Sequence, residues 1–523
     1  MTIEQAKQLG PVAHTSAGWV LGGAREGVEI YRGIPYGANC EGERRFLPPV
    51  AAQAWEGVRD CRKNGPIAMQ FGGSISGSEG LGPHFNGGHP EDFGVAEERQ
   101  GENCLVLNVL TPACDTEKRP VLVYFHGGGF ATGSGTLAIG AHRYVKENNQ
   151  VLVSVNHRLN IFGYLYLDQL DSRYEGSGMA GLLDLVLALE WVRQNIASFG
   201  GDPENVTIMG ESGGGMKVSS LLAMPRARKL FRRAVVESGS APAFAVDPQR
   251  AAEIARRVLE RLGVAEDHLE ALSTLPAEKI LEASRMETGR ELGFEPVADG
   301  KNARYNPERS FLPDPESRTV PLLVGASQDE LAIFMAPGQK DGRDVVQPEN
   351  LREYLLQRGG LLPADGLSIT EENVDRVIEA FRQGGKGCED ADHLAMFICS
   401  NCSLLGAGAA FQAAACARAG EPVYRYLVTY DFPHPGLPGK RYSWHTADLP
   451  LQLRVVLHSE EEEFSRVLAE MLASFVRDGV PTTKGKPWPR YTPEGRETMV
   501  LDEPCRVARE PQEALLQALG TTL

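Results

Sequence analysis

The sequence contains no unbroken apolar run of the length that a membrane-spanning helix needs, and it has fewer basic than acidic residues. Lys and Arg number 53 against 69 Asp and Glu, which gives a formal net charge of −16. Because nucleic-acid binding depends on clustered Lys and Arg, this balance argues against a nucleic-acid partner. The 42% of hydrophobic residues suffice for the large core of a globular enzyme.

Cysteine is scarce and scattered, with nine residues along the chain. Only Cys399 and Cys402 form a CxxC pair, and no second pair completes a zinc site. We interpret this pair as two buried thiols on a helix. The segment Met1–Gly10 lacks a basic start followed by an apolar run, so we expect no secretory signal. An odd, scattered set of thiols is typical of a reducing compartment, and we therefore expect a cytoplasmic protein.

Short apolar runs rich in Val and Ile alternate with helical patterns along the chain. The runs that we expect to form buried strands are Val121–Phe125, Val151–Val155, Val206–Met209, Ala234–Val236, Pro321–Val324 and Val423–Thr429. Between them, Gly181–Ala197 carries apolar residues at helical spacing. Strands that alternate with helices require crossover connections, so the sequence predicts an α/β fold with a mostly parallel, twisted central sheet flanked by helices.

A candidate nucleophile lies in the segment GESGG at residues 210–214, which matches the pattern G-x-S-x-G. The predicted strand Val206–Met209 precedes the segment, and a helix is expected from Gly213 to about Ala223. In a tight turn of this kind the serine hydroxyl is presented above the sheet, and the flanking residues must be small. The pattern alone also fits an incidental serine in a Gly-rich turn, but its position between strand and helix favours Ser212 as the nucleophile.

The segment HGGGF at residues 126–130 directly follows another predicted strand. Glycine loops of this type supply backbone N–H groups that stabilise the oxyanion of a tetrahedral intermediate. We expect the donors to be the N–H groups of Gly128, Gly129 and Gly213.

A catalytic serine of this type needs a histidine later in the chain, with an acid between the two. The histidines in suitable positions are His393, His434, His445 and His458. The first and last lie in sequence that we interpret as helical, and we expect them to be structural. The other two lie in a Pro/Gly-rich loop after the strand Val423–Thr429, and their position does not choose between them.

The candidate acid lies in the segment SQDE at residues 327–330, after the predicted strand Pro321–Val324. Either Asp329 or Glu330 has the carboxylate needed to orient an imidazole. The residues alone leave both open.

Two stretches, at about 243–321 and 350–419, consist of charged amphipathic segments such as Pro248–Leu262 and Asn373–Arg382. We interpret them as helical insertions over the active site of one domain that spans residues 1–523. The Gly-rich stretch Phe71–Gly101 predicts a long loop, and long loops in compact enzymes often form lids or gorge walls.

These motifs resemble the type-B carboxylesterase/lipase family, which includes bacterial para-nitrobenzyl esterases, animal carboxylesterases and cholinesterases. The resemblance extends from about Gly10 to Val507. Its blocks are YRGIPY at 31–36, ENCLVLNV at 102–109, HGGGF at 126–130, NHRL at 156–159 and FGGDP at 199–203 with GESGG at 210–214. The resemblance implies the α/β-hydrolase fold and a serine carboxylesterase.

The resemblance also implies roles for individual residues. It maps the family's acid onto Glu330 and its histidine onto His445, in the segment HTAD. It further suggests a supporting network of Glu211, Ser238 and Asp448. The implied reaction proceeds through an acyl-enzyme on Ser212 and requires neither a metal nor an organic cofactor.

Three departures from the family pattern bear on function. The cysteine that pairs with Cys104 in secreted members is replaced by Ala68, and the histidine block reads HTAD in place of HG-x-E. The stretch Phe71–Gly101 contains no Trp for binding a choline cation, which argues against cholinesterase activity. We expect a small-molecule ester as substrate. Alternatives are an esterase or amidase for bulky or polyester substrates, and a non-catalytic cholinesterase-like binding protein.

Overall fold

The computed structural model describes residues 1–72, 99–285, 293–312, 319–335, 339–340, 343–358, 367–382 and 387–523. The chain forms two compact units. The first comprises Met1–Met209, Lys217–Arg233 and Pro242–Arg318, and the second comprises Gly210–Met216, Ala234–Ala241 and Thr319–Leu523. Most of the predicted Gly-rich loop Phe71–Gly101 lies outside the described residues.

The first unit contains a mixed sheet with the strand order β9-β7-β8-β6-β4-β3. Its strands are β3 (Gly23–Arg25), β4 (Val28–Pro35), β6 (Val106–Thr111), β7 (Arg119–Phe125), β8 (Val151–Val155) and β9 (Gly201–Glu211). Strands β7 and β8 are parallel, with Val121 opposite Val151, whereas β3, β4 and β6 run antiparallel to their neighbours. A smaller sheet contains β1 (Val12–Thr15), β2 (Gly18–Leu21) and β5 (Val58–Asp60).

The second unit contains strands in the order β20-β19-β14-β11-β10. They are β10 (Arg233–Glu237), β11 (Leu322–Ser327), β14 (Val423–Val428), β19 (Glu497–Leu501) and β20 (Arg506–Arg509). The first four are parallel, and β20 is antiparallel at the edge. Strands β10, β11 and β14 are buried along their whole length, as expected for parallel strands covered on both faces.

All six strands expected from the apolar runs are present, with ends shifted by a few residues. Strands β1 to β4 were not predicted, because they alternate imperfectly between apolar and polar residues. The largely buried strands β6 and β19 were not predicted either. Helix α8 (Pro248–Leu262) agrees with the prediction because its ends are chemically marked. The Asp247 side chain accepts from the N–H of Gln249, and Gly263 ends the helix with a φ of +70°.

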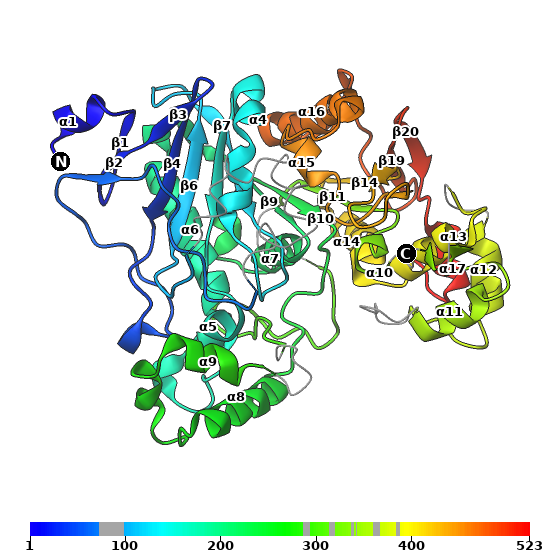
Figure 1. Ribbon diagram of the computed structural model, residues 1–523, viewed down its shortest axis with the longest axis horizontal. Coiled ribbons are helices and arrows are strands. Elements are labelled where there is room, and N and C mark those ends of the chain that lie inside the picture. Colours follow the sequence, from blue (N-terminus) through cyan, green and yellow to red (C-terminus); the bar gives the residue numbers. More distant parts are fainter. Residues whose placement is uncertain are drawn as a thin grey trace. The chain divides into compact units, whose positions relative to one another are not determined.

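The other helices that the structure describes in the first unit are α1 (Ile3–Lys7), α4 (His142–Asn148), α5 (Asn160–Tyr164), α6 (Ala180–Asn195) and α9 (Ala277–Ala283). Helix α7 (Gly213–Leu222) begins directly after Ser212. The second unit contains α10 (Ala332–Met335), α11 (Leu351–Arg358), α12 (Val374–Arg382), α13 (Ala391–Asn401), α14 (Leu404–Arg418), α15 (Leu449–Gln452), α16 (Glu462–Asp478) and α17 (Glu513–Ala518). Figure 1 shows α8 packed beside α9, and α12 beside α13 and α17.

The segment from His393 to Ala419, which the sequence predicts to be helical, forms two helices. The second begins after Ser403, whose side chain caps α14 by accepting from Gly406 N–H. Cys399 and Cys402 are buried thiols at the end of α13. The helical assignment of His458 was wrong, since this residue lies in a bend before a short 3₁₀ turn. The description of the whole chain as one domain with insertions stays a prediction.

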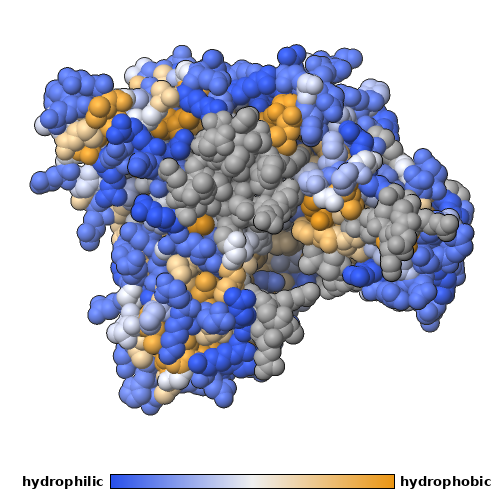
Figure 2. All heavy atoms as spheres, in the orientation of Figure 1, coloured by the Kyte–Doolittle hydropathy of each residue, from blue (hydrophilic) through white to orange (hydrophobic). Residues whose placement is uncertain are grey.

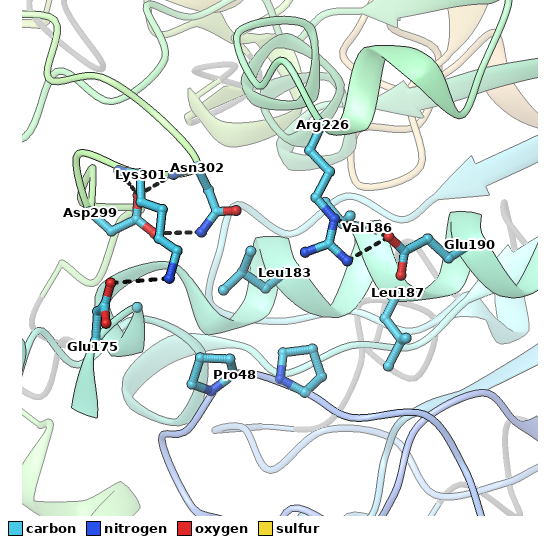
Figure 3. A pocket seen from close by; sticks show the side chains of 12 residues that line it. Pro48, Glu175, Leu183, Val186, Leu187, Glu190, Arg226, Asp299, Lys301 and Asn302 are labelled. Atoms are coloured by element: carbon cyan, nitrogen blue, oxygen red, sulfur yellow. Dashed lines mark hydrogen bonds and ion pairs between the residues drawn. The ribbon is translucent and has the colours of Figure 1, made fainter. Parts of the chain in front are cut away.

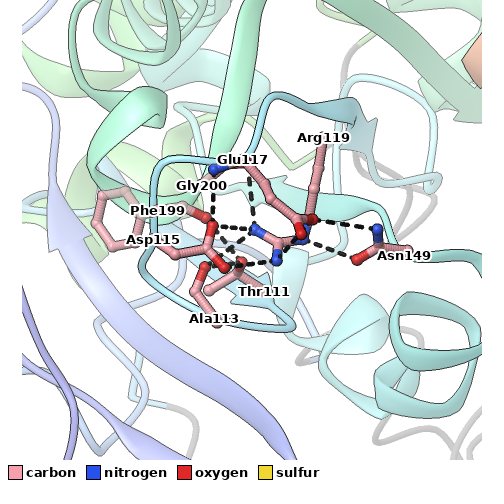
Figure 4. Close-up of polar contacts among 8 residues, drawn as sticks. All are labelled: Thr111, Ala113, Asp115, Glu117, Arg119, Asn149, Phe199 and Gly200. Atoms are coloured by element: carbon pink, nitrogen blue, oxygen red, sulfur yellow. Dashed lines mark hydrogen bonds and ion pairs between the residues drawn. The ribbon is translucent and has the colours of Figure 1, made fainter.

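Arg119, at the start of β7, joins three loops of the first unit (Figure 4). Its guanidinium donates to both oxygens of Asp115 at 2.6 and 2.7 Å and to the amide oxygen of Asn149 at 2.8 Å. Its backbone N–H donates to Gly200 O at 3.0 Å, and its side chain is only 6% exposed. These contacts hold the loops of Asp115, Asn149 and Gly200 together at the start of β7.

Replacing Arg119 with methionine is expected to lower the free energy of unfolding by about 1 kcal/mol, because the loops lose the buried guanidinium that joins them, while the exposed acceptors Asp115 and Asn149 bind water instead. Chemical denaturation measures the effect. The matched control is Arg256→Met, which removes an exposed pair with Glu266 and is expected to change stability by less than about 0.5 kcal/mol. Equal losses in the two variants would contradict a stabilising role for the cluster.

Hydrophilic residues cover most of the surface shown in Figure 2, with small separate hydrophobic patches. Among the described residues, no helix is both long and apolar enough to cross a membrane.

Candidate active site

Ser212 lies in a strained turn between β9 and α7. Its φ of +56° is in the left-handed region, which costs a non-glycine residue about 1–3 kcal/mol. The turn is held by its N–H, which donates to Glu237 O at 2.8 Å. A Cβ on Gly210 would come within 2.2 Å of the Gly214 backbone, and one on Gly239 within 2.1 Å of Ser212 O. A Cβ does not fit at either position; the sequence predicted this for Gly210, which flanks Ser212 in the motif, but not for Gly239.

Glu330 and His445 form a buried pair in the second unit. His445 Nδ1 lies 2.5 Å from Glu330 Oε2. The other carboxylate oxygen accepts from Ser238 Oγ at 2.6 Å and from Ser327 N–H at 2.7 Å. Glu330 is fully buried, and its two oxygens are thus held by three donors. This arrangement fixes the orientation of the imidazole.

The alternatives left open by the sequence have different partners. His434 Nε2 lies 3.3 Å from the carbonyl oxygen of Ala332, and burial lowers the pKa of His434. Asp329 pairs instead with His393, with 3.0 Å between Oδ2 and Nε2. The hydroxyl of Ser212 donates to no residue that the structure describes, and such bonds are often long in enzymes without substrate.

Carboxylates surround His445. Glu211 Oε1 lies 3.3 Å from His445 Nε2, the nitrogen that does not face Glu330. Burial alone lowers the pKa of His445, but Glu211 and Glu330 outweigh this effect and raise it to about 9. Asp448 is also buried, and Gln452 Nε2 donates to its Oδ2 at 3.0 Å. Burial, followed by the charge of Glu330, raises the pKa of Asp448 to about 6. The site therefore favours a positive charge on the imidazole.

The glycine loop belongs to the first unit. Gly128 and Gly129 have φ values of +84° and +61°, and a Cβ on Gly128 would lie 2.4 Å from Thr132 O. The carbonyl of Gly128 accepts from the N–H groups of Ala131 at 3.2 Å and Thr132 at 3.0 Å. Within the described part of the chain, the N–H groups of Gly128 and Gly129 donate to no acceptor. They are thus available to a substrate oxygen.

Comparison with known proteins identifies the family. The model of the carboxylesterase family matches residues 10–518. The chain belongs to the carboxylesterase family. It is 31% identical to the para-nitrobenzyl esterase of Bacillus subtilis, over 97% of this chain and 98% of that protein. It is 29% identical to carboxylesterase 1C of Rattus norvegicus, over 92% of this chain and 88% of that protein.

Solved structures agree with this assignment. The structure titled PNB esterase has a TM-score of 0.73 at 30% identity and covers 97% of this chain and 99% of its own. An esterase from Clostridium hathewayi that can hydrolyze aliphatic aromatic polyesters has a TM-score of 0.78 at 30% identity, covering 98% of each chain. The predicted α/β-hydrolase fold is confirmed, and this carboxylesterase is a serine carboxylic ester hydrolase.

The His393–Asp329 pair is another buried ion pair of the carboxylesterase, next to the pair of Glu330 and His445. Asp329 Oδ2 also accepts from Ser443 N–H at 3.1 Å, two residues before His445. Burial lowers the pKa of His393, but Asp329 outweighs it and raises the pKa to about 9. Asp431 adds a third potential metal ligand, with ligand atoms within 4.8 Å of one another. Because Asp329 and His393 already pair with each other, we interpret the cluster as a brace for the loop that carries His445.

One expectation concerns the cysteines. Cys104 is buried and free, as are Cys399 and Cys402, and Ala68 is buried.

A surface pocket of about 280 Å³ lies on α6 of the first unit (Figure 3). Its floor includes Leu183, and ion pairs such as Arg226–Glu190 at 2.6 Å lie at its rim. None of the predicted site residues lines it, and we assign no chemistry to it.

Proposed function

We propose that Ser212, His445 and Glu330 are the catalytic triad of this carboxylesterase. The observation that carries the proposal is the Glu330–His445 pair at 2.5 Å, in the same unit as the strained turn of Ser212. His445 accepts the Ser212 proton as the oxygen attacks the ester carbonyl, and it returns a proton to the leaving alcohol. Water then hydrolyses the acyl-enzyme by the same steps, with His445 again acting as base.

We propose that the N–H groups of Gly128, Gly129 and Gly213 stabilise the oxyanion. The N–H groups of Gly128 and Gly129 have no acceptor among the described residues. Gly213 is the first residue of helix α7, where N–H groups lack intrahelical partners. Loss of one such donor typically lowers kcat by about 10²–10³-fold. Glu211, Ser238 and Asp448 are proposed supporting residues: Ser238 orients Glu330, and the two acids favour the imidazolium.

Replacing Glu211 with glutamine is expected to move the acid limb of the pH profile of kcat/KM to lower pH. Only neutral His445 accepts a proton, so activity rises as pH increases through its pKa of about 9. Removing the carboxylate 3.3 Å from Nε2 destabilises the imidazolium and lowers this pKa. The control is Glu253→Gln, an exposed residue of α8. An unchanged acid limb in Glu211→Gln would argue against this electrostatic role.

The proposed substrates are small carboxylic esters, by similarity to the para-nitrobenzyl esterase. A bulky or polyester substrate is the second candidate, because the structure of a polyester-hydrolysing esterase aligns over 98% of this chain. The odd, scattered set of nine cysteines supports the proposal of a reducing, cytoplasmic compartment.

The experiment that tests the function measures hydrolysis of para-nitrophenyl acetate, butyrate and octanoate, together with an aromatic polyester oligomer. Turnover of the para-nitrophenyl esters with a clear preference for one acyl length supports the small-ester substrate. Faster hydrolysis of the polyester oligomer than of the para-nitrophenyl esters supports the polyester alternative. Absence of hydrolysis for every ester would refute the proposed function.

A further inference from the structure

Lys217 is a buried lysine beside the glycine loop of the first unit. It lies on helix α7 and is 0% exposed. Its Nζ donates to His126 O at 2.9 Å and to Gly129 O at 2.8 Å. Nζ also lies 5.8 Å from the centre of the Phe130 ring. Burying an ammonium is expensive unless strong acceptors compensate, so this position needs a structural or functional reason.

The two carbonyls that Lys217 binds lie on either side of the proposed oxyanion donors. A peptide group is planar, so its C=O and N–H are fixed together. The N–H groups of Gly128 and Gly129 belong to the two peptides between residues 127 and 129. Lys217 binds the carbonyl of the peptide before this pair and the carbonyl of the peptide after it. It therefore clamps both ends of the donor segment.

The other carbonyls of the loop are occupied as well. The Gly127 carbonyl lies 2.9 Å from His126 Nδ1, and the Gly128 carbonyl accepts from two N–H groups. The Phe130 carbonyl accepts from Asn160 N–H at 2.6 Å, and the Ala131 carbonyl accepts from Asn160 Nδ2 at 3.2 Å. With every carbonyl from residue 126 to 131 bonded, the free N–H groups of the loop are held in one conformation.

The two imidazoles beside Lys217 do not add to its positive charge. His126 and His157 are buried, with 4.8 Å between their ring centroids. Burial, followed by the charge of Lys217, lowers the pKa of both imidazoles well below the ordinary range. Both rings are therefore neutral, and the ammonium is a fixed positive charge next to the peptides that carry the donors. A charge in this place favours an oxyanion.

We propose that Lys217 is a positioning residue of the oxyanion loop. Lys217 binds the carbonyls of the peptides on either side of the Gly128 and Gly129 N–H groups, and it thereby holds these donors in place and strengthens them by its charge. This inference rests on the proposed function. It predicts that Lys217 acts on the transition state, in which the oxyanion forms, and has little effect on ground-state binding.

The test compares Lys217→Met, Lys217→Gln and Lys217→Arg with the wild type, using para-nitrophenyl butyrate and a trifluoromethyl ketone that forms a tetrahedral adduct. In the Met and Gln variants we expect kcat to fall about 10- to 100-fold, less than for a lost donor, and KM to change less than about threefold. Affinity for the ketone should fall in parallel with kcat/KM. Lys217→Arg should retain most of kcat because it keeps the charge.

The matched control is Lys146→Met, which removes another lysine-to-carbonyl hydrogen bond, from Nζ to Glu26 O at 2.8 Å. It should leave kcat and ketone affinity unchanged. If Lys217→Met does not fold, Lys217→Gln decides, since it keeps a donor of similar size.

A lower melting temperature with unchanged kcat and ketone affinity would overturn the inference and leave Lys217 a merely structural role. Absence of hydrolysis by the wild type, with no adduct on Ser212, would instead refute the proposed function on which the inference rests.

Discussion

Replacing Ser212 with alanine is expected to lower kcat/KM for para-nitrophenyl butyrate by about 10⁴- to 10⁶-fold. The reason is chemical: no other hydroxyl occupies the turn that Gly210 and Gly239 make possible, and without a nucleophile no acyl-enzyme forms. A small rate above that of water should persist, because loop donors and binding still act on the substrate. The strain of the turn should remain, since alanine also disfavours a φ of +56°.

Intact mass after treatment with an organophosphate gives a second readout of the same prediction. The wild type should gain one adduct, located on Ser212, and the alanine variant should gain none. The control is Ser273→Ala, in which an exposed hydroxyl that donates to Glu270 O is removed. This control should keep both turnover and adduct. Substantial turnover by Ser212→Ala would show that another group is the nucleophile.

The sequence predicted the elements whose chemistry is local. Strand β7 is buried along residues 121–125 and therefore has the unbroken apolar run VLVYF. The turn at Ser212 is marked by glycines that its geometry demands. The edge strands β3 and β20 were missed, because a short, half-exposed strand has no distinctive pattern.

The choice among neighbouring polar residues depends on packing and is not encoded locally. Asp329 and Glu330 are adjacent in the chain, yet their carboxylates bind different histidines. Only the family resemblance ranked Glu330 first. Lys217 was missed entirely, although the sequence carries one clue: it is the single charged residue in the helix GGGMKVSSLL. A lone charged residue among small and apolar residues indicates a buried side chain that needs hydrogen-bond acceptors within the protein.

Replacing Glu330 with glutamine is expected to lower kcat/KM by about 10⁴-fold, with KM changed far less. The carboxylate accepts from His445 Nδ1, which leaves Nε2 unprotonated and able to accept the Ser212 proton. An amide can present its NH₂ group to Nδ1, which favours the opposite tautomer, and it cannot stabilise the imidazolium. Steady-state kinetics on para-nitrophenyl butyrate measure the loss.

The neighbouring acid provides the matched comparison, because Asp329→Asn changes the same chemistry one residue away. Asp329 pairs with His393 and accepts from Ser443 N–H, so its loss should loosen the loop of His445 and cost less than about tenfold in kcat/KM. The two variants bury similar amides, so a difference in stability alone cannot reverse their order. If Asp329→Asn were the more damaging, the acid would be Asp329, and the 2.5 Å contact of Glu330 would serve the structure of the loop.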